Sequence, residues 1–223
     1  MIRVVLADDE ALIRSGLRMI LEAEPDIRVI GEAEDGGEAL DLAVETDPDL
    51  VVMDLRMPGM DGIEATKLIR RRMPSVRVLV VTTFDLDEYV LAALRGGADG
   101  FLLKDTAPEA LVDAVRTVAV GDALLAPTVT RRLIGHYVGQ SPSDEGLAAR
   151  FEGLTERELD VTKLVARGMT NSEIADELFL GNGTVKTHVT AILSKLGLAN
   201  RAQIVVAAYE SGLIVVGETG TSA

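Results

Sequence analysis

Three aspartates in the N-terminal half each follow a short apolar run, a position from which they could form one site. Asp8 and Asp9 directly follow the apolar run Ile2–Ala7, and Asp54 follows the apolar run Leu50–Met53. A short buried strand that ends in a carboxylate and precedes a helix delivers that side chain to the carboxyl edge of a parallel sheet. Clustered carboxylates repel one another unless a cation neutralises them, and such oxygen ligands suit Mg²⁺. The three aspartates therefore predict a magnesium-dependent phosphoryl site.

Two further strand ends add hydrogen-bond donors at the same edge. Thr82 and Lys104 each close a short apolar run, and their hydroxyl and ammonium groups supply donors for phosphoryl oxygens. A carboxylate can form an acyl phosphate, so Asp54 is the expected nucleophile, while Asp8 and Asp9 hold the ion. For any one acid taken singly, capping of the following helix is the better explanation. The coincidence of all five at strand ends favours the phosphoryl site.

Strand-like and helix-like segments alternate five times before residue 120. The apolar runs lie at residues 2–7, 27–33, 50–53, 76–81 and 100–103. The amphipathic stretches lie at about 10–22, 36–46, 62–72, 85–96 and 107–119. This alternation is typical of an α/β fold in which helices cover both faces of a doubly wound, five-stranded parallel sheet. In the flavodoxin-like strand order 2-1-3-4-5, the first and third strands are neighbours, so their aspartates would meet.

The pattern changes beyond Gly121, which indicates a second domain. We expect a first domain at 1–121, a linker at 122–153, a small all-α domain at 154–212 and a tail at 213–223 whose last residues, 217–223, are disordered. Within the linker, residues 123–127 read as a loop and residues 128–137 allow a short helix. Four short helices are predicted for the second domain, at about 155–167, 171–178, 183–196 and 200–210.

Composition limits the class of protein. The 223 residues, 48% of them apolar, suffice for two modest cores, and the absence of cysteine excludes disulfides and thiolate metal sites. No apolar stretch reaches membrane-spanning length and acids arrive too early for a signal peptide, so we expect a cytoplasmic protein with no membrane partner. The net charge is −14, but residues 1–149 hold 15 Lys/Arg against 27 Asp/Glu and residues 150–210 hold 7 against 8. The acidity therefore belongs to the first domain and does not exclude nucleic-acid binding by the second.

The third predicted helix of the second domain has two distinct faces. Its apolar face carries Val185, Val189, Ile192 and Leu196. Lys186, Thr187 and Thr190 face outward, and such a row of donors suits a major groove and its phosphates. The alternative is an ordinary amphipathic helix with a solvated face, which charge alone would favour.

Residues 1–119 resemble the receiver domain of two-component response regulators. The matches are the pair Asp8 and Asp9, the segment MDLRMPGMDG at 53–62, the strand end at Thr82 and the segment FLLK at 101–104. The resemblance implies that a histidine kinase phosphorylates Asp54. It further implies that Mg²⁺ is bound by Asp9, Asp54 and the backbone carbonyl of Arg56, and that Thr82 and Lys104 contact the phosphoryl group.

Phe101 matches the switch aromatic of that family. The resemblance implies that its ring rotates inward as Thr82 moves on phosphorylation. The alternative is a strand residue that packs in the core in either state.

Residues 154–210 resemble the LuxR-type helix-turn-helix domain. The matches are LTERE at 154–158, NSEIA at 171–175, TVKTHV at 184–189, LSKL at 193–196 and Arg201. Together with the receiver, this domain indicates the NarL/FixJ class of response regulators. The resemblance implies that the helix at about 183–195 enters the major groove, with Lys186, Thr187 and Thr190 nearest the bases and Lys195 near phosphate. Gly181 stands where the family usually has a serine cap.

These observations predict a DNA-binding transcriptional regulator controlled by phosphorylation, rather than an enzyme. Its receiver would mediate its own phosphoryl transfer and dephosphorylation with Mg²⁺. The expected partners are a sensor histidine kinase, double-stranded DNA at promoter half-sites and a second copy of the chain, with RNA polymerase as a further candidate. Phosphorylation is expected to release the helical domain and to promote a homodimer.

Two alternatives come from other classes of protein. A haloacid-dehalogenase-like phosphatase also uses an aspartate nucleophile with Mg²⁺, but it needs a second Asp two residues later, where this chain has Arg56. A pure interaction module would use the helical domain to bind protein. Salt-sensitive binding to duplex DNA would exclude that module.

Overall fold

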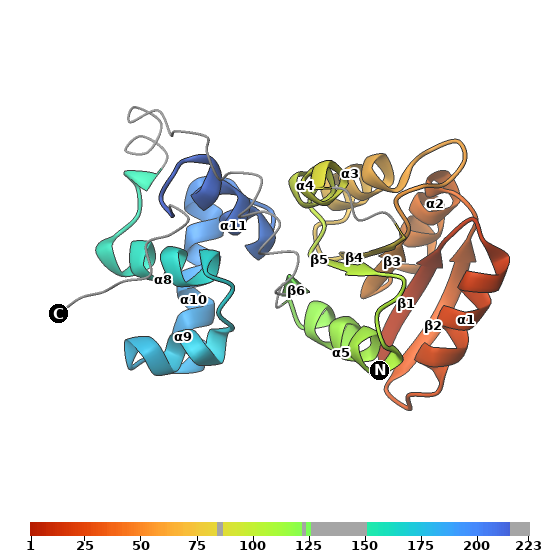
Figure 1. Ribbon diagram of the computed structural model, residues 1–223, viewed down its shortest axis with the longest axis horizontal. Coiled ribbons are helices and arrows are strands. Elements are labelled where there is room, and N and C mark those ends of the chain that lie inside the picture. The colour runs from red at the N-terminus through yellow and green to blue at the C-terminus, as the bar shows by residue number, and fades with distance from the viewer. Residues whose placement is uncertain (84–86, 122–123, 126–150, 215–223) are drawn as a thin grey trace. The chain divides into compact units, whose positions relative to one another are not determined.

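The computed structural model of the chain is shown in Figure 1. It describes residues 1–83, 87–121, 124–125 and 151–214. Two compact units, Met1–Ala126 and Pro127–Ala223, are each described by themselves. The helix expected at 128–137 and most of the expected linker and tail lie outside the described residues. Within the described ranges, no helix is long and apolar enough to cross a membrane.

The first unit is built on a parallel sheet. Its strands are β1 (Ile2–Ala7), β2 (Ile27–Ala33), β3 (Leu50–Met53), β4 (Arg77–Thr82), β5 (Gly100–Leu103) and β6 (Leu124–Leu125). Their order is β2-β1-β3-β4-β5-β6, and every neighbouring pair is parallel. This confirms the doubly wound, flavodoxin-like α/β fold, with β1 and β3 adjacent as expected.

The prediction of a loop at residues 123–127 was wrong for two of them. Leu124 and Leu125 form β6, which pairs with Gly100 and Phe101 of β5 and adds a sixth strand to the expected five. The open edge of β5 offers backbone donors and acceptors to any extended segment beside it. Two residues are too few to show a period, so a strand this short leaves no pattern in the sequence.

Five helices cover the two faces of the sheet. They are α1 (Ala11–Glu22), α2 (Gly36–Thr46), α3 (Gly62–Arg72), α4 (Asp87–Gly96) and α5 (Pro108–Ala119). Helices α1 and α5 lie on one face, and α2, α3 and α4 lie on the other (Figure 1). Because the central strands are buried from both sides, Val4–Ala7 and Leu50–Met53 are wholly buried, which explains their uninterrupted apolar sequence.

The described residues of the second unit, 151–214, form helices and turns without a strand, as predicted. Its helices are α8 (Glu156–Ala166), α9 (Asn171–Leu178), α10 (Asn182–Leu196) and α11 (Arg201–Glu210). Two capping boxes fix where α8 and α9 begin: Thr155 with Glu158, as expected, and Thr170 with Glu173. Gly181 is the N-cap of α10 and, having no side chain, leaves that helix without a side-chain cap.

Phe179 ends α9 in an unfavourable conformation. It has φ 54° and ψ 46°, in the left-handed region, and it is 95% exposed. A bulky residue pays for this conformation, whereas glycine adopts it freely and is the usual residue at a helix C-terminus of this kind. We therefore expect Phe179→Gly to raise the free energy of unfolding of the helical unit by about 1 kcal/mol. Urea unfolding followed by circular dichroism checks this, and a lower stability would show that the ring makes a stabilising contact.

Candidate functional site

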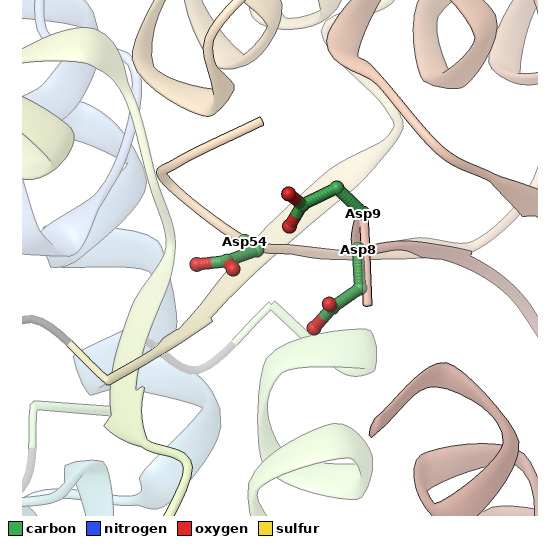
Figure 2. A group of neighbouring side chains, drawn as sticks. All are labelled: Asp8, Asp9 and Asp54. Carbon is green, nitrogen blue, oxygen red and sulfur yellow. The ribbon is translucent and has the colours of Figure 1, made fainter. Parts of the chain in front are cut away.

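The three predicted acids meet at the carboxyl ends of β1 and β3. Ala7 and Met53 are register partners, and the Asp54 amide donates to the Ala7 carbonyl at 2.8 Å, so both strands release their acids at one edge. Carboxylate oxygens of Asp8, Asp9 and Asp54 lie within 4.8 Å of one another (Figure 2). Asp8 and Asp54 are buried and Asp9 is exposed. The predicted convergence is therefore confirmed.

Lys104 supplies the positive charge of this cluster. Its Nζ lies 2.8 Å from Asp54 Oδ2 and 2.7 Å from Asp8 Oδ2, and its side chain is only 6% exposed. Burial by itself would lower the pKa of Lys104, but the two carboxylates outweigh burial and raise that pKa above its ordinary value. The ammonium group is therefore held charged between the two acids.

Thr82 and Phe101 occupy the neighbouring strand ends. Thr82 is fully buried at the end of β4, and its carbonyl accepts a hydrogen bond of 2.9 Å from the Lys104 amide. Phe101 is also fully buried, in register with Val80. Strand pairing thus links Thr82 directly to the lysine of the site, while the Phe101 ring packs in the core.

The carboxylate oxygens of Asp8, Asp9 and Asp54 are suitable ligands for a hard divalent cation. Asp8 Oδ2 is buried, and within the described part of the chain it has no hydrogen-bond donor in acceptable geometry, although the Lys104 ammonium is close. Burial raises the pKa of Asp8 above its ordinary 3.8, and the attraction of Lys104 offsets this only in part. A buried carboxylate with an unsatisfied oxygen, beside the exposed Asp9, is compatible with Mg²⁺, which requires oxygen ligands and retains several waters.

Neutralising Asp8 should stabilise the receiver when no metal is present. Because the folded-state pKa is raised, ionisation of Asp8 opposes folding fully above the raised value; this cost shrinks as the pH falls below that value and is absent below the ordinary pKa of 3.8. We expect Asp8→Asn to raise the free energy of unfolding near neutral pH without Mg²⁺, and the gain to vanish in acid. Mg²⁺ should stabilise wild type but not the variant. Urea unfolding across pH checks this, with exposed Asp41→Asn as control, and a destabilised variant at neutral pH would contradict it.

A pocket opens beside the acids. It has a volume of about 400 Å³ and is lined by Asp9, Leu55, Arg56, Met57, Asp61, Ile63 and Tyr89. The guanidinium of Arg56 donates to the Tyr89 hydroxyl and lies 5.2 Å from the centre of its ring. Arg56, whose backbone carbonyl was expected to bind Mg²⁺, therefore lines the same pocket as Asp9. Tyr89 was not anticipated, because one tyrosine on an amphipathic helix carries no functional signal.

Helix α10 presents the predicted DNA-facing residues to solvent. Lys186, Thr187 and Thr190 are exposed, while Val185 and Ile192 are buried on the opposite face, which confirms the two-faced pattern. The hydroxyls of Thr187 and Thr190 each donate to the carbonyl four residues earlier, at 3.0 Å. Each hydroxyl oxygen retains acceptor capacity toward a base edge.

Lys195 forms an ion pair with another helix of the same unit. Its Nζ lies 2.7 Å from Glu158 Oε2, and the same oxygen accepts the Thr155 amide at 2.7 Å. The hydrogen bond from Lys195, followed by that from Thr155, lowers the pKa of Glu158 to about 2. Glu158 therefore both caps α8 and ties it to α10, a second role that the capping-box pattern does not reveal.

Family models match both units. The response regulator receiver domain matches residues 4–116, and the luxR family of bacterial regulatory proteins matches residues 152–208. Transcriptional regulatory protein LiaR of Bacillus subtilis is 44% identical over 214 residues, covering 96% of this chain and 100% of LiaR. Uncharacterized transcriptional regulatory protein YxjL of the same organism is 43% identical over 215 residues, covering 96% and 97%.

Solved structures of response regulators are also similar to this chain. The response regulator ChrA of a heme-sensing two-component system is 38% identical, covers 96% of this chain and 98% of its own, and has a TM-score of 0.53. A structure of two RcsB dimers bound to two parallel DNAs is 27% identical, covers 94% and 98%, and has a TM-score of 0.56. The chain belongs to the NarL/FixJ family of two-component response regulators, which join a receiver to a LuxR-type DNA-binding domain. It is a transcription regulator, and its domains imply DNA and a sensor kinase as partners.

Proposed function

We propose that Asp54 accepts a phosphoryl group from a sensor histidine kinase and that this modification controls DNA binding. The observation that carries the proposal is the placement of Asp54, buried at a strand end with Lys104 at 2.8 Å and two further acids beside it. Asp54 Oδ1 accepts the Leu55 amide at 2.6 Å, so backbone and lysine together fix the carboxylate plane. A nucleophile held in this way is oriented before the phosphoryl donor arrives.

In the proposed reaction, an Asp54 oxygen attacks the phosphorus of a phosphohistidine. The new O–P bond forms as the P–N bond breaks, and the imidazole nitrogen keeps the electron pair. Lys104 and the Thr82 hydroxyl would donate to the phosphoryl oxygens, offsetting charge that the three acids alone would repel. Asp8, Asp9, Asp54 and the Arg56 carbonyl would hold Mg²⁺, which supplies charge neutralisation. Water attacking the same phosphorus would return the free carboxylate, which makes dephosphorylation intrinsic to the receiver.

The conformational change caused by phosphorylation would be transmitted through β4 and β5. Thr82 is linked by its backbone to Lys104, and Phe101 is buried on the neighbouring strand, so drawing the Thr82 hydroxyl toward a phosphoryl group displaces a packed region. We infer that this change releases the helical domain and favours a homodimer. RNA polymerase is a further candidate partner once the dimer is on DNA.

The proposed DNA contacts are on α10. Lys186, Thr187 and Thr190 would read base edges, and Lys195 would reach phosphate only by giving up Glu158. With so few cations and an acidic receiver, one copy should bind weakly, and paired half-sites would supply useful affinity.

Fluorescence anisotropy with a duplex selected from a random-sequence library tests the control of DNA binding. We expect phosphorylated wild type to bind at least tenfold more tightly than unphosphorylated protein, a coupling within the range of ordinary switches. Asp54→Asn should remain in the weak state under the same treatment. Equal affinity of both forms would contradict the release model, and absence of salt-sensitive binding would favour a protein-binding module instead.

A further inference from the structure

Arg14 of α1 contacts the acidic site through the backbone carbonyl of Asp8. No pattern in the sequence marks this arginine as a functional residue. Its side chain is 9% exposed and donates in three directions. Nη1 donates to the Asp8 carbonyl at 2.6 Å, Nη2 to Glu34 Oε1 at 2.8 Å and Nε to Glu32 Oε2 at 3.1 Å. A planar guanidinium with fixed donor directions holds three such acceptors in one arrangement, which a flexible ammonium cannot do.

The bond to the Asp8 carbonyl completes the restraint of that residue. The Asp8 amide donates to the Ala33 carbonyl at 3.1 Å, and Asp8 Oδ1 accepts the Glu10 amide at 2.9 Å. Its Oδ2 faces Lys104 at 2.7 Å. Arg14 holds the remaining polar group, the carbonyl of the peptide that leads into Asp9. Because Asp9 is attached to that peptide, the peptide's orientation sets the direction in which the Asp9 side chain leaves the backbone.

We propose that Arg14 is a positioning residue for the metal site: it fixes the Asp8–Asp9 peptide so that both carboxylates face Mg²⁺. This inference rests on the proposed Mg²⁺ site. Glu32 of β2 and Glu34, just after that strand, hold the guanidinium in place, which makes β2 and its carboxyl end part of the support of the site. Partners that orient metal ligands in this way typically contribute ten- to hundredfold to metal affinity.

Charge and geometry predict opposite effects for the loss of Arg14. Removing a positive charge near a divalent cation removes repulsion, so a purely electrostatic role predicts equal or tighter Mg²⁺ binding in Arg14→Met. Loss of a positioning contact predicts weaker binding. Whether Mg²⁺ affinity rises or falls therefore distinguishes an electrostatic role of Arg14 from a positioning role. A measurement of the free energy of unfolding alone would not distinguish them.

Mg²⁺ affinity is measured by isothermal titration calorimetry on the full chain, which has no tryptophan to report binding by fluorescence. We expect Arg14→Met to bind Mg²⁺ about tenfold more weakly than wild type. Arg18→Met is the matched control, because Arg18 pairs with the other oxygen of Glu32 on the surface, with its side chain 47% exposed. That control should retain wild-type affinity within about twofold.

Arg14→Lys keeps the experiment decisive if Arg14→Met fails to fold. It retains the charge, but one ammonium cannot satisfy three separated acceptors, so Mg²⁺ affinity should still fall several-fold. Wild-type affinity in a folded Arg14 variant, or an equal loss in Arg18→Met, would overturn the inference. Absence of Mg²⁺ binding by wild type would overturn the proposed metal site itself, which is a distinguishable result.

Discussion

Gly62→Ala is expected to destabilise the receiver by about 3 kcal/mol or more and to abolish phosphorylation. Gly62 begins α3 directly against the backbone of the proposed phosphorylation site. A Cβ at this position would lie 1.9 Å from the Asp54 carbonyl oxygen and 3.0 Å from the Leu55 Cα. These are backbone atoms and cannot rotate aside, so either α3 or the end of β3 must move. Movement of β3 would carry the Asp54 side chain away from Lys104.

Hydrogen-exchange mass spectrometry measures this effect in the receiver separately from the helical unit. Gly16→Ala is the control, since a Cβ there meets nothing within 4 Å and alanine is the better helix former. We expect the control to gain about 0.5–1 kcal/mol of stability. If Gly62→Ala were as stable as its control, the close approach of α3 to the end of β3 would be wrong.

Lys104→Met should produce the second large effect. It leaves the buried carboxylates of Asp8 and Asp54 without their shared cation, and breaking a buried pair on one side typically costs about 3–5 kcal/mol. Because the folded-state pKa of Lys104 is raised, its stabilisation persists up to its ordinary pKa of 10.5 and is lost above the raised value. In acid, protonation of Asp8, whose pKa is raised, should reduce the difference between variant and wild type.

Urea unfolding with and without Mg²⁺ tests the charge argument for Lys104→Met. Mg²⁺ should restore more stability to the variant than it adds to wild type, because it replaces the missing positive charge between the acids. Lys67→Met, at an exposed position of α3, is the control and should change stability little. A variant destabilised equally at all pH values, and insensitive to Mg²⁺, would show that packing of the lysine stem is what matters.

The fold was largely predictable because its signals are local. Central strands buried on both faces must be apolar throughout, so Leu50–Met53 is visible as a strand and Asp54 as its end. The capping box of Thr155 marks the start of α8 in the same local way. The flavodoxin-like strand order places β1 beside β3. That adjacency was enough to predict that the three acids at their ends lie close together.

The features that were missed depend on contacts between distant positions. Lys195 meets Glu158 across 37 residues, and Arg14 meets Glu34 across 20, so neither pair leaves a periodic trace. A lysine on a helix proposed to bind DNA and an arginine on an amphipathic helix look alike in sequence whether or not they are paired. Only the packing of α8 against α10, and of α1 against β2, assigns these residues their partners.

Intact mass spectrometry shows directly whether Asp54 is the phosphorylation site. Wild type and Asp54→Asn are incubated with acetyl phosphate and Mg²⁺, and their masses are compared. We expect wild type to gain one phosphoryl group and the variant to gain none. Modification of both proteins, or of neither, would contradict the assignment of Asp54 as the acceptor of the phosphoryl group from this donor.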